Sequence, residues 1–117
     1  MNVEELREYC LSKKAVTESF PFDDVSLVMK VVDKMFALIA LDSHPTLIAL
    51  KCDPERAIEL RERYSAVIPA WHFNKKHWNN VIMDGSVSEK EVKEWIDHSY
   101  DLVVKGLTKQ QKLMING

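Results

Sequence analysis

Two apolar runs separated by a short polar step form the clearest pattern along the chain. The runs are Ser26–Val32 and Met35–Leu41, and only Asp33-Lys34 lies between them. Apolar runs joined by two polar residues predict a β-hairpin with a two-residue turn. A third strand is expected over Thr46–Cys52, after a polar loop.

The predicted turn also assigns side chains to faces, because it pairs Val32 with Met35 and alternate residues of a strand point the same way. One face is then wholly apolar and carries Leu27, Met29, Val31, Phe36, Leu38 and Ala40. Of these, Leu27, Met29, Phe36 and Leu38 are expected to pack against helices. The opposite face carries Val28, Lys30, Val32, Met35, Ala37 and Ile39. A single lysine therefore stands in apolar surroundings on the second face.

Helix-capping residues and prolines predict the elements before and after the hairpin. A first helix is expected over Val3–Lys13 with Asn2 as its N-cap, and a strand over Ala15–Phe20. Asp53 is expected to cap a second helix that has Pro54 at its first position.

The last third of the chain predicts one strand and two helices. The strand spans Trp78–Met83, and Ser88 with Glu91 forms a capping box for a third helix that stops at Gly106. A short helix follows over Thr108–Ile115. The predicted fold is α+β, a largely antiparallel sheet packed against helices, with helices at both chain ends and one domain over residues 1–117.

Composition places the chain among globular proteins without a membrane segment. Its 117 residues are 46% apolar and 29% charged, with a net charge of −2, so any contact with a polyanion must be local. No apolar run approaches the ~20 residues that a membrane helix needs, and the acidic start lacks the features of a signal peptide. Cys10 and Cys52 are isolated, which is typical of reduced thiols in a cytoplasmic protein.

The longest stretch without acidic residues is also rich in aromatic residues. No carboxylate occurs between Glu62 and Asp84, and the segment Trp71–Trp78 combines three aromatic rings with lysines and histidines. Cations beside aromatic faces suit contact with phosphates and bases. Alternatively, this aromatic-basic stretch, residues 71–78, is a strand flanking the core with its polar positions in water.

Lys30 and Lys51 offer a second candidate feature. We expect them on the same sheet face, pointing toward His72 or Trp78, where two ammonium groups would repel unless they are hydrated or neutralised by an anion. The alternative is that both lysines extend along the sheet margin into water.

Enzymatic and metal-binding functions find little support in the sequence. There is no glycine-rich phosphate loop, no His-Glu-x-x-His and no Gly-x-Ser-x-Gly. Cys52 before a helix start is the best lone nucleophile, although a buried apolar role is more common for such a cysteine. His72 and His77 lie five residues apart in a segment predicted to be extended, which makes a poor metal pair. We expect no enzyme, no cofactor and no metal.

Several ordered motifs resemble a known family. They are Glu18-Ser-Phe20-Pro-Phe22, Lys30-Val-Val-Asp-Lys-Met-Phe36, Leu50-Lys51-Cys52-Asp-Pro-Glu55, His72-Phe-Asn-Lys75-Lys-His77-Trp78 and Ser99-Tyr100. Together they resemble the MmcQ/YjbR-like family, whose fold is similar to that of the bacterial frataxin CyaY. The resemblance implies a single-domain bacterial cytoplasmic protein with a CyaY-like fold, commonly described as DNA-binding. Where that family often has glycine, this chain has Asp23 and Asp33.

The sequence therefore leads to a DNA-binding or regulatory accessory domain as its first functional hypothesis. The expected nucleic-acid-binding residues are Lys30, Lys51, His72, Asn74, Lys75, Lys76, His77 and Trp78. The lysines would contact phosphates and Trp78 would stack on a base. The alternative is a module that binds a small anionic ligand or a protein through the same lysines. A pocket enclosing Lys30 and Lys51 would favour the ligand, whereas a positive ridge reaching Lys75 and Lys76 would favour nucleic acid; we expect a monomer in either case.

Overall fold

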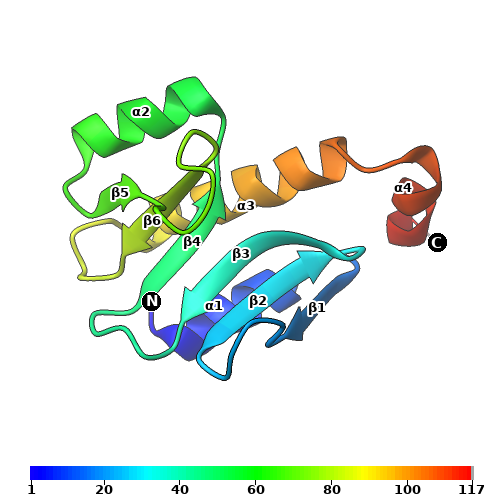
Figure 1. Ribbon diagram of the computed structural model, residues 1–117, viewed down its shortest axis with the longest axis horizontal. Helices are drawn as coiled ribbons and strands as arrows, with labels where there is room; N and C mark the ends of the chain where they lie inside the picture. Colours follow the sequence, from blue (N-terminus) through cyan, green and yellow to red (C-terminus); the bar gives the residue numbers. More distant parts are fainter. Residues whose placement is uncertain (117) are drawn as a thin grey trace.

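The fold is one antiparallel sheet with helices packed on a single side. The computed structural model describes residues 1–116. The elements in chain order are α1 (Val3–Leu11), β1 (Val16–Ser19), β2 (Ser26–Val31), β3 (Lys34–Ala40), β4 (Leu47–Lys51), α2 (Pro54–Arg63), β5 (Val67–Pro69), β6 (Trp78–Ile82), α3 (Glu89–Lys105) and α4 (Lys109–Asn116). The six strands are ordered β1-β2-β3-β4-β6-β5, and every neighbouring pair is antiparallel (Figure 1). The predicted α+β class, with helices at both ends, is confirmed.

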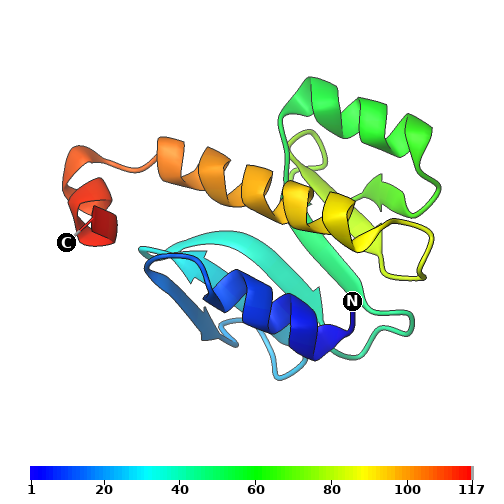
Figure 2. The same cartoon turned by 180° about the vertical axis from the view of Figure 1, so that it is seen from behind.

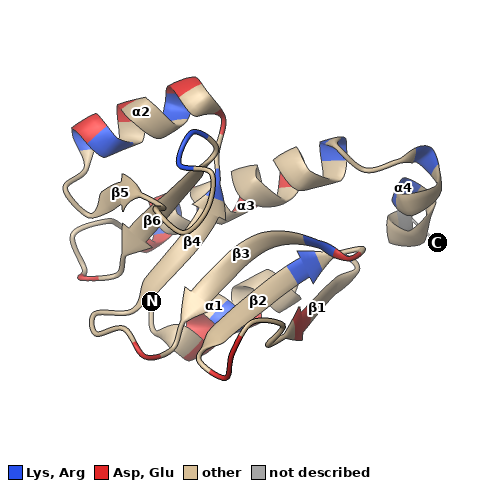
Figure 3. Cartoon of the chain, in the orientation of Figure 1, with Lys and Arg blue, Asp and Glu red and all other residues tan. Residues whose placement is uncertain are grey.

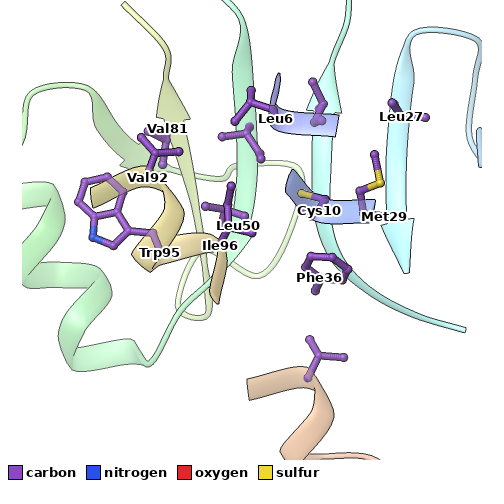
Figure 4. Packing of buried hydrophobic residues seen from close by; sticks show 14 of the residues in the cluster. Leu6, Cys10, Leu27, Met29, Phe36, Leu50, Val81, Val92, Trp95 and Ile96 are labelled. Carbon is purple, nitrogen blue, oxygen red and sulfur yellow. The ribbon is translucent and has the colours of Figure 1, made fainter. Parts of the chain in front are cut away.

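The helices leave one face of the sheet bare. Figure 2 shows α1 and α3 lying across the same face, and α2 packs beside β5 and β6. The core fills the space between α1, α3 and the sheet, where Leu6, Phe36 and Ile96 are fully buried (Figure 4). Burial of this kind contributes roughly 1.5–3 kcal/mol for each large apolar side chain. The opposite face, which we call the bare face, carries none of the helices formed by residues 1–116.

The β2–β3 hairpin turns one residue earlier than the sequence predicts. Val31 pairs with Lys34, so the turn is Val32-Asp33 and Lys34 belongs to β3. Both turn residues have positive φ, 47° for Val32 and 67° for Asp33, as a primed two-residue turn requires. A β-branched residue rarely adopts this conformation. Val32 is nevertheless 9% exposed, so its side chain packs into the core and offsets part of the backbone cost.

A β-bulge reverses the predicted faces beyond Phe36. Lys30 pairs with Met35 and Met29 with Ala37, which leaves Phe36 as an extra residue in β3. Phe36, Ala37 and Ile39 consequently all belong to the helix-side core. The predicted packing of Leu38 against helices is wrong, because Leu38 lies on the bare face together with Ala40. The burial of Phe36 is confirmed at 0% exposure.

Local capping signals predict the helix starts correctly. The side chains of Asn2, Asp53 and Ser88 each accept the expected backbone N–H. The first helix ends at Leu11 rather than Lys13. β5 was not predicted from the sequence, since three residues give too short a pattern. Within residues 1–116, no helix combines the length and apolar character that crossing a membrane demands.

Candidate binding face of the sheet

The bare face has a small apolar centre that residues outside the helices cover. Val28, Leu38 and Ala49 are buried there although no helix lies over them. Met35, Phe73 and Trp78 pack on them. Phe73 comes from the aromatic-basic stretch and stacks on Trp78, with ring centroids 5.1 Å apart and an interplanar angle of 29°. The centre divides the bare face into two ends.

Lys30 and Lys51 lie at one end of this face, which we call the lysine end. Lys30 is paired with Met35 across the hairpin, and Lys51 is paired with Trp78 across β4 and β6. Paired residues share a face, so both lysines project on the side of Met35 and Trp78. Only β3 separates their strands, and two strand spacings amount to about 10 Å. Both lysines are half-buried.

A buried serine on α3 fixes the backbone beneath the lysine end. The Ser99 hydroxyl accepts a hydrogen bond from the Lys51 N–H at 2.9 Å and donates one to the Phe36 carbonyl oxygen at 2.5 Å. The β3–β4 pairing ends at Ala37 and Leu50, so these two backbone groups lie just beyond the last rung. Ser99 therefore supplies the bonds that the bulge removes from the ladder. In the sequence, the Ser99-Tyr100 motif gave no signal for this role.

The aromatic-basic stretch forms a hydrogen-bonded loop up to His77, so the expected extended conformation is wrong. The loop is closed by a bond from the Ala70 N–H to the Trp78 carbonyl and by one from the His77 N–H to the Asn74 carbonyl. The Asn74 side chain accepts the Lys76 N–H at 3.0 Å, which commits that oxygen to the loop itself. Lys75 and Lys76 are exposed, and Figure 3 shows a basic segment in the loop between β5 and β6.

A groove occupies the other end of the bare face and contains neither lysine. Its volume is about 630 Å³, and its lining consists of Phe22, Asp23, Val25, Ser26, Leu38, Ala40, Asp42, Leu47, Ala49, Trp71, His72, Phe73 and Asn80. His72 thus borders this groove, whereas the other expected nucleic-acid-binding residues are absent from its lining. A pocket enclosing Lys30 and Lys51 would have favoured an anionic ligand; this groove contains neither lysine and is lined by the acidic side chains of Asp23 and Asp42.

Both cysteine thiols are buried, and burial makes them poor nucleophiles. Cys52 is 5% exposed, and burial raises its pKa to about 11. Burial also raises the pKa of Cys10 to about 12. Both groups are therefore protonated at neutral pH, and the interpretation of Cys52 as a nucleophile is not supported. Among residues 1–116, no three His, Cys, Asp or Glu side chains are grouped so that they could hold a metal ion.

Comparison with known proteins gives relatives over almost the whole chain. The profile of the family described as YjbR matches residues 11–102. An Escherichia coli relative, the uncharacterized protein YjbR, is 32% identical over 115 residues, covering 98% of each chain. The crystal structure of a Deinococcus radiodurans protein with a DUF419 domain superimposes with a TM-score of 0.92 at 39% identity, covering 98% of this chain and 88% of that one. A Pseudomonas syringae structure gives a TM-score of 0.76 at 27% identity, covering 87% of this chain and 98% of that one.

Proposed function

This chain belongs to the YjbR family, and we propose that it is a nucleic-acid-binding accessory domain that holds a strand across the lysine end of its bare face. The observation that carries the proposal is the position of Lys30 and Lys51 on one sheet face beside Trp78. Phosphates would contact the ammonium groups, and a base would stack against the indole ring. DNA is the expected partner.

The shape of the face favours an unpaired strand over a duplex. Reading a duplex requires an element that projects into a groove of the nucleic acid. The lysine end instead lies on a sheet surface with a stacked pair of rings, Phe73 and Trp78. Sheet surfaces with aromatic residues suit splayed, unpaired bases.

The small number of basic side chains on this face leads us to expect a modest affinity for nucleic acid. Lys30, Lys51, Lys75 and Lys76 make at most three to four phosphate contacts, and the net charge of −2 gives no long-range attraction. Asp23 and Asp24 lie at the opposite end, where they would repel a phosphate backbone. A strand would therefore follow the lysine end toward the loop at Lys75 and avoid the groove.

We also infer the finer features that the family resemblance implies. A CyaY-like fold is supported by a single antiparallel sheet with α1 and α3 on one face. A cytoplasmic location is supported by Cys10 and Cys52, which are free and buried thiols. We include in the same proposal that the protein binds DNA as a monomer.

The test is a binding titration with fluorescent single-stranded DNA, single-stranded RNA and duplex DNA at two salt concentrations. We expect single strands to bind best, with log affinity falling against log salt at a slope of roughly −2 to −3, given about 0.7 per phosphate contact. Duplex DNA should bind more weakly. The absence of saturable binding to any of the three at low salt would overturn the proposal.

A further inference from the structure

The groove has a chemistry opposite to that of the lysine end. Asp23 and Asp42 line it, and no lysine or arginine does. Aromatic rings border it as well: Phe22 and Trp71 are 66% and 63% exposed, which is unusual for such large apolar side chains. Carboxylates next to exposed aromatic faces attract organic cations, through charge and through the negative face of each ring.

The fold itself brings the two carboxylates to the same rim. Asp23 lies in the loop before β2, and Asp42 lies just after β3. The Leu41 N–H donates a 2.8 Å hydrogen bond to the Val25 carbonyl, so the pairing of β2 with β3 continues past the end of both strands. Figure 3 shows acidic positions in both loops at this end of the sheet.

The Asp23 carboxylate at this rim is held in place by its own loop. The Asp23 carboxylate accepts the backbone N–H of Val25 at 3.0 Å and that of Ser26 at 2.6 Å, and these bonds hold its pKa below the usual range. In the part of the chain that the structure describes, neither Asp23 nor Asp42 forms a salt bridge. A cation in the groove would therefore meet two carboxylates, and none of the lining residues is a lysine or arginine.

The floor of the groove accepts an apolar body. Ala40 and Ala49 leave room beside Leu38, and the Asn80 amide is the polar group on the same floor. A volume of about 630 Å³ falls within the range of small-molecule sites, about 300–1,000 Å³. Rings on the rim, small apolar residues below and a hydrogen-bonding amide are the composition expected of such a site.

We propose that this groove binds a small organic cation, an apolar molecule that carries a quaternary or protonated amine. The ammonium group lies between Asp23 and Asp42, and the apolar body lies against Trp71 and Phe22. This inference goes beyond nucleic-acid binding and uses none of the lysines.

Titration with benzyltrimethylammonium, followed by ¹H–¹⁵N NMR, tests the site directly. We expect saturable shift changes at residues 22–26, 42, 71–73 and 80. Dimethylbenzylcarbinol, a neutral molecule of nearly the same shape, should bind about tenfold more weakly, because it lacks the charge. Equal binding of both probes, shifts confined to other residues, or no saturation at millimolar concentration would overturn the proposal.

Matched variants separate charge from shape. Asp23→Asn with Asp42→Asn should weaken binding of benzyltrimethylammonium about tenfold or more. Asp33→Asn with Asp101→Asn makes the same change in net charge at exposed positions away from the groove and should leave binding within about twofold. Ala40→Leu fills the floor without changing charge and should also block the probe; unchanged binding would contradict the site. Lys30→Gln with Lys51→Gln should not alter binding of benzyltrimethylammonium. The experiment therefore distinguishes a failure of this proposal from a failure of the nucleic-acid-binding proposal.

Discussion

The Ser99 hydroxyl donates a 2.5 Å hydrogen bond to the carbonyl oxygen of Phe36, from the middle of α3 to the bulge in β3. The same hydroxyl accepts the N–H of Lys51 from β4. One fully buried side chain thus joins a helix to two strands that are 63 and 48 residues away in the sequence. It holds the bulge and, with it, the backbone that carries Lys51 on the opposite face.

Ser99→Ala should destabilise the protein by roughly 2–3 kcal/mol. The alanine leaves one buried donor and one buried acceptor without partners, which costs more than the loss of the bonds alone. Chemical denaturation measures the free energy of unfolding, and hydrogen exchange should show faster exchange of the Lys51 amide. Ser65→Ala, at an exposed position, is the control and should stay within about 0.5 kcal/mol. Normal protection of the Lys51 amide in Ser99→Ala would contradict this role.

Phe36→Ala should cost roughly 3–5 kcal/mol, as large-to-small changes in a core do. The ring is fully buried and meets Tyr100 edge to face, with centroids 5.4 Å apart. Phe22→Ala removes the same atoms from a side chain that is 66% exposed, and we expect less than about 1 kcal/mol for it. Equal losses for the two variants, measured by denaturation in urea, would be inconsistent with the burial of Phe36.

The sequence predicts the fold where its signals are local and fails where a distant residue decides. The caps at Asn2, Asp53 and Ser88 act within one turn of helix, so they can be recognised in the chain itself. The bulge at Phe36 is bonded by Ser99 from a distant helix, and no pattern within the hairpin reveals that partner. Because the side-chain period of a strand is two, that extra residue sends Leu38 and Ala40 to the bare face.

The candidate site could be predicted in part for the same reason. Lys30 and Lys51 share a face, and the sequence indicates this because each is a single lysine in an otherwise apolar strand. The groove could not be predicted, because Asp23, Asp42 and Trp71 come from three separate loops. Loop residues carry no periodicity, so only the fold shows that they meet.

His98 should make the protein less stable as the pH falls. Its Nε2 accepts the Asp53 N–H at 3.2 Å, and burial, followed by the charge of Arg56, lowers its pKa from 6.5, while Asp53 and Asp101 act in the opposite sense. A group with a lowered pKa in the folded state contributes stability above its unfolded pKa and loses it on acidification. We expect the free energy of unfolding to decline as the pH drops below about 6.5, before the carboxylates titrate.

Denaturation at several pH values between about 5 and 8, on both sides of the reference pKa of histidine near 6.5, measures this decline. His98→Gln keeps an acceptor for Asp53 without a titrating group, so its stability should change less over the same range. His44→Gln replaces an exposed histidine and should retain the wild-type profile. Superimposable profiles for His98→Gln and the wild type would show that another group is responsible.

Charge reversal at the lysine end should strongly weaken binding of single-stranded DNA. Lys30→Glu with Lys51→Glu replaces both phosphate contacts beside Trp78 by repulsion, and we expect at least a tenfold loss of affinity at low salt. Lys109→Glu with Lys112→Glu on α4 lowers the net charge by the same amount at exposed positions and should have little effect. Because Lys30 and Lys51 are half-buried, thermal unfolding must show that the charge-reversed variant still folds. Lys30→Gln with Lys51→Gln removes the charges without reversing them and is the milder test. Equal losses for the two charge-reversed pairs would mean that net charge governs binding, and the lysine end would then not be the site.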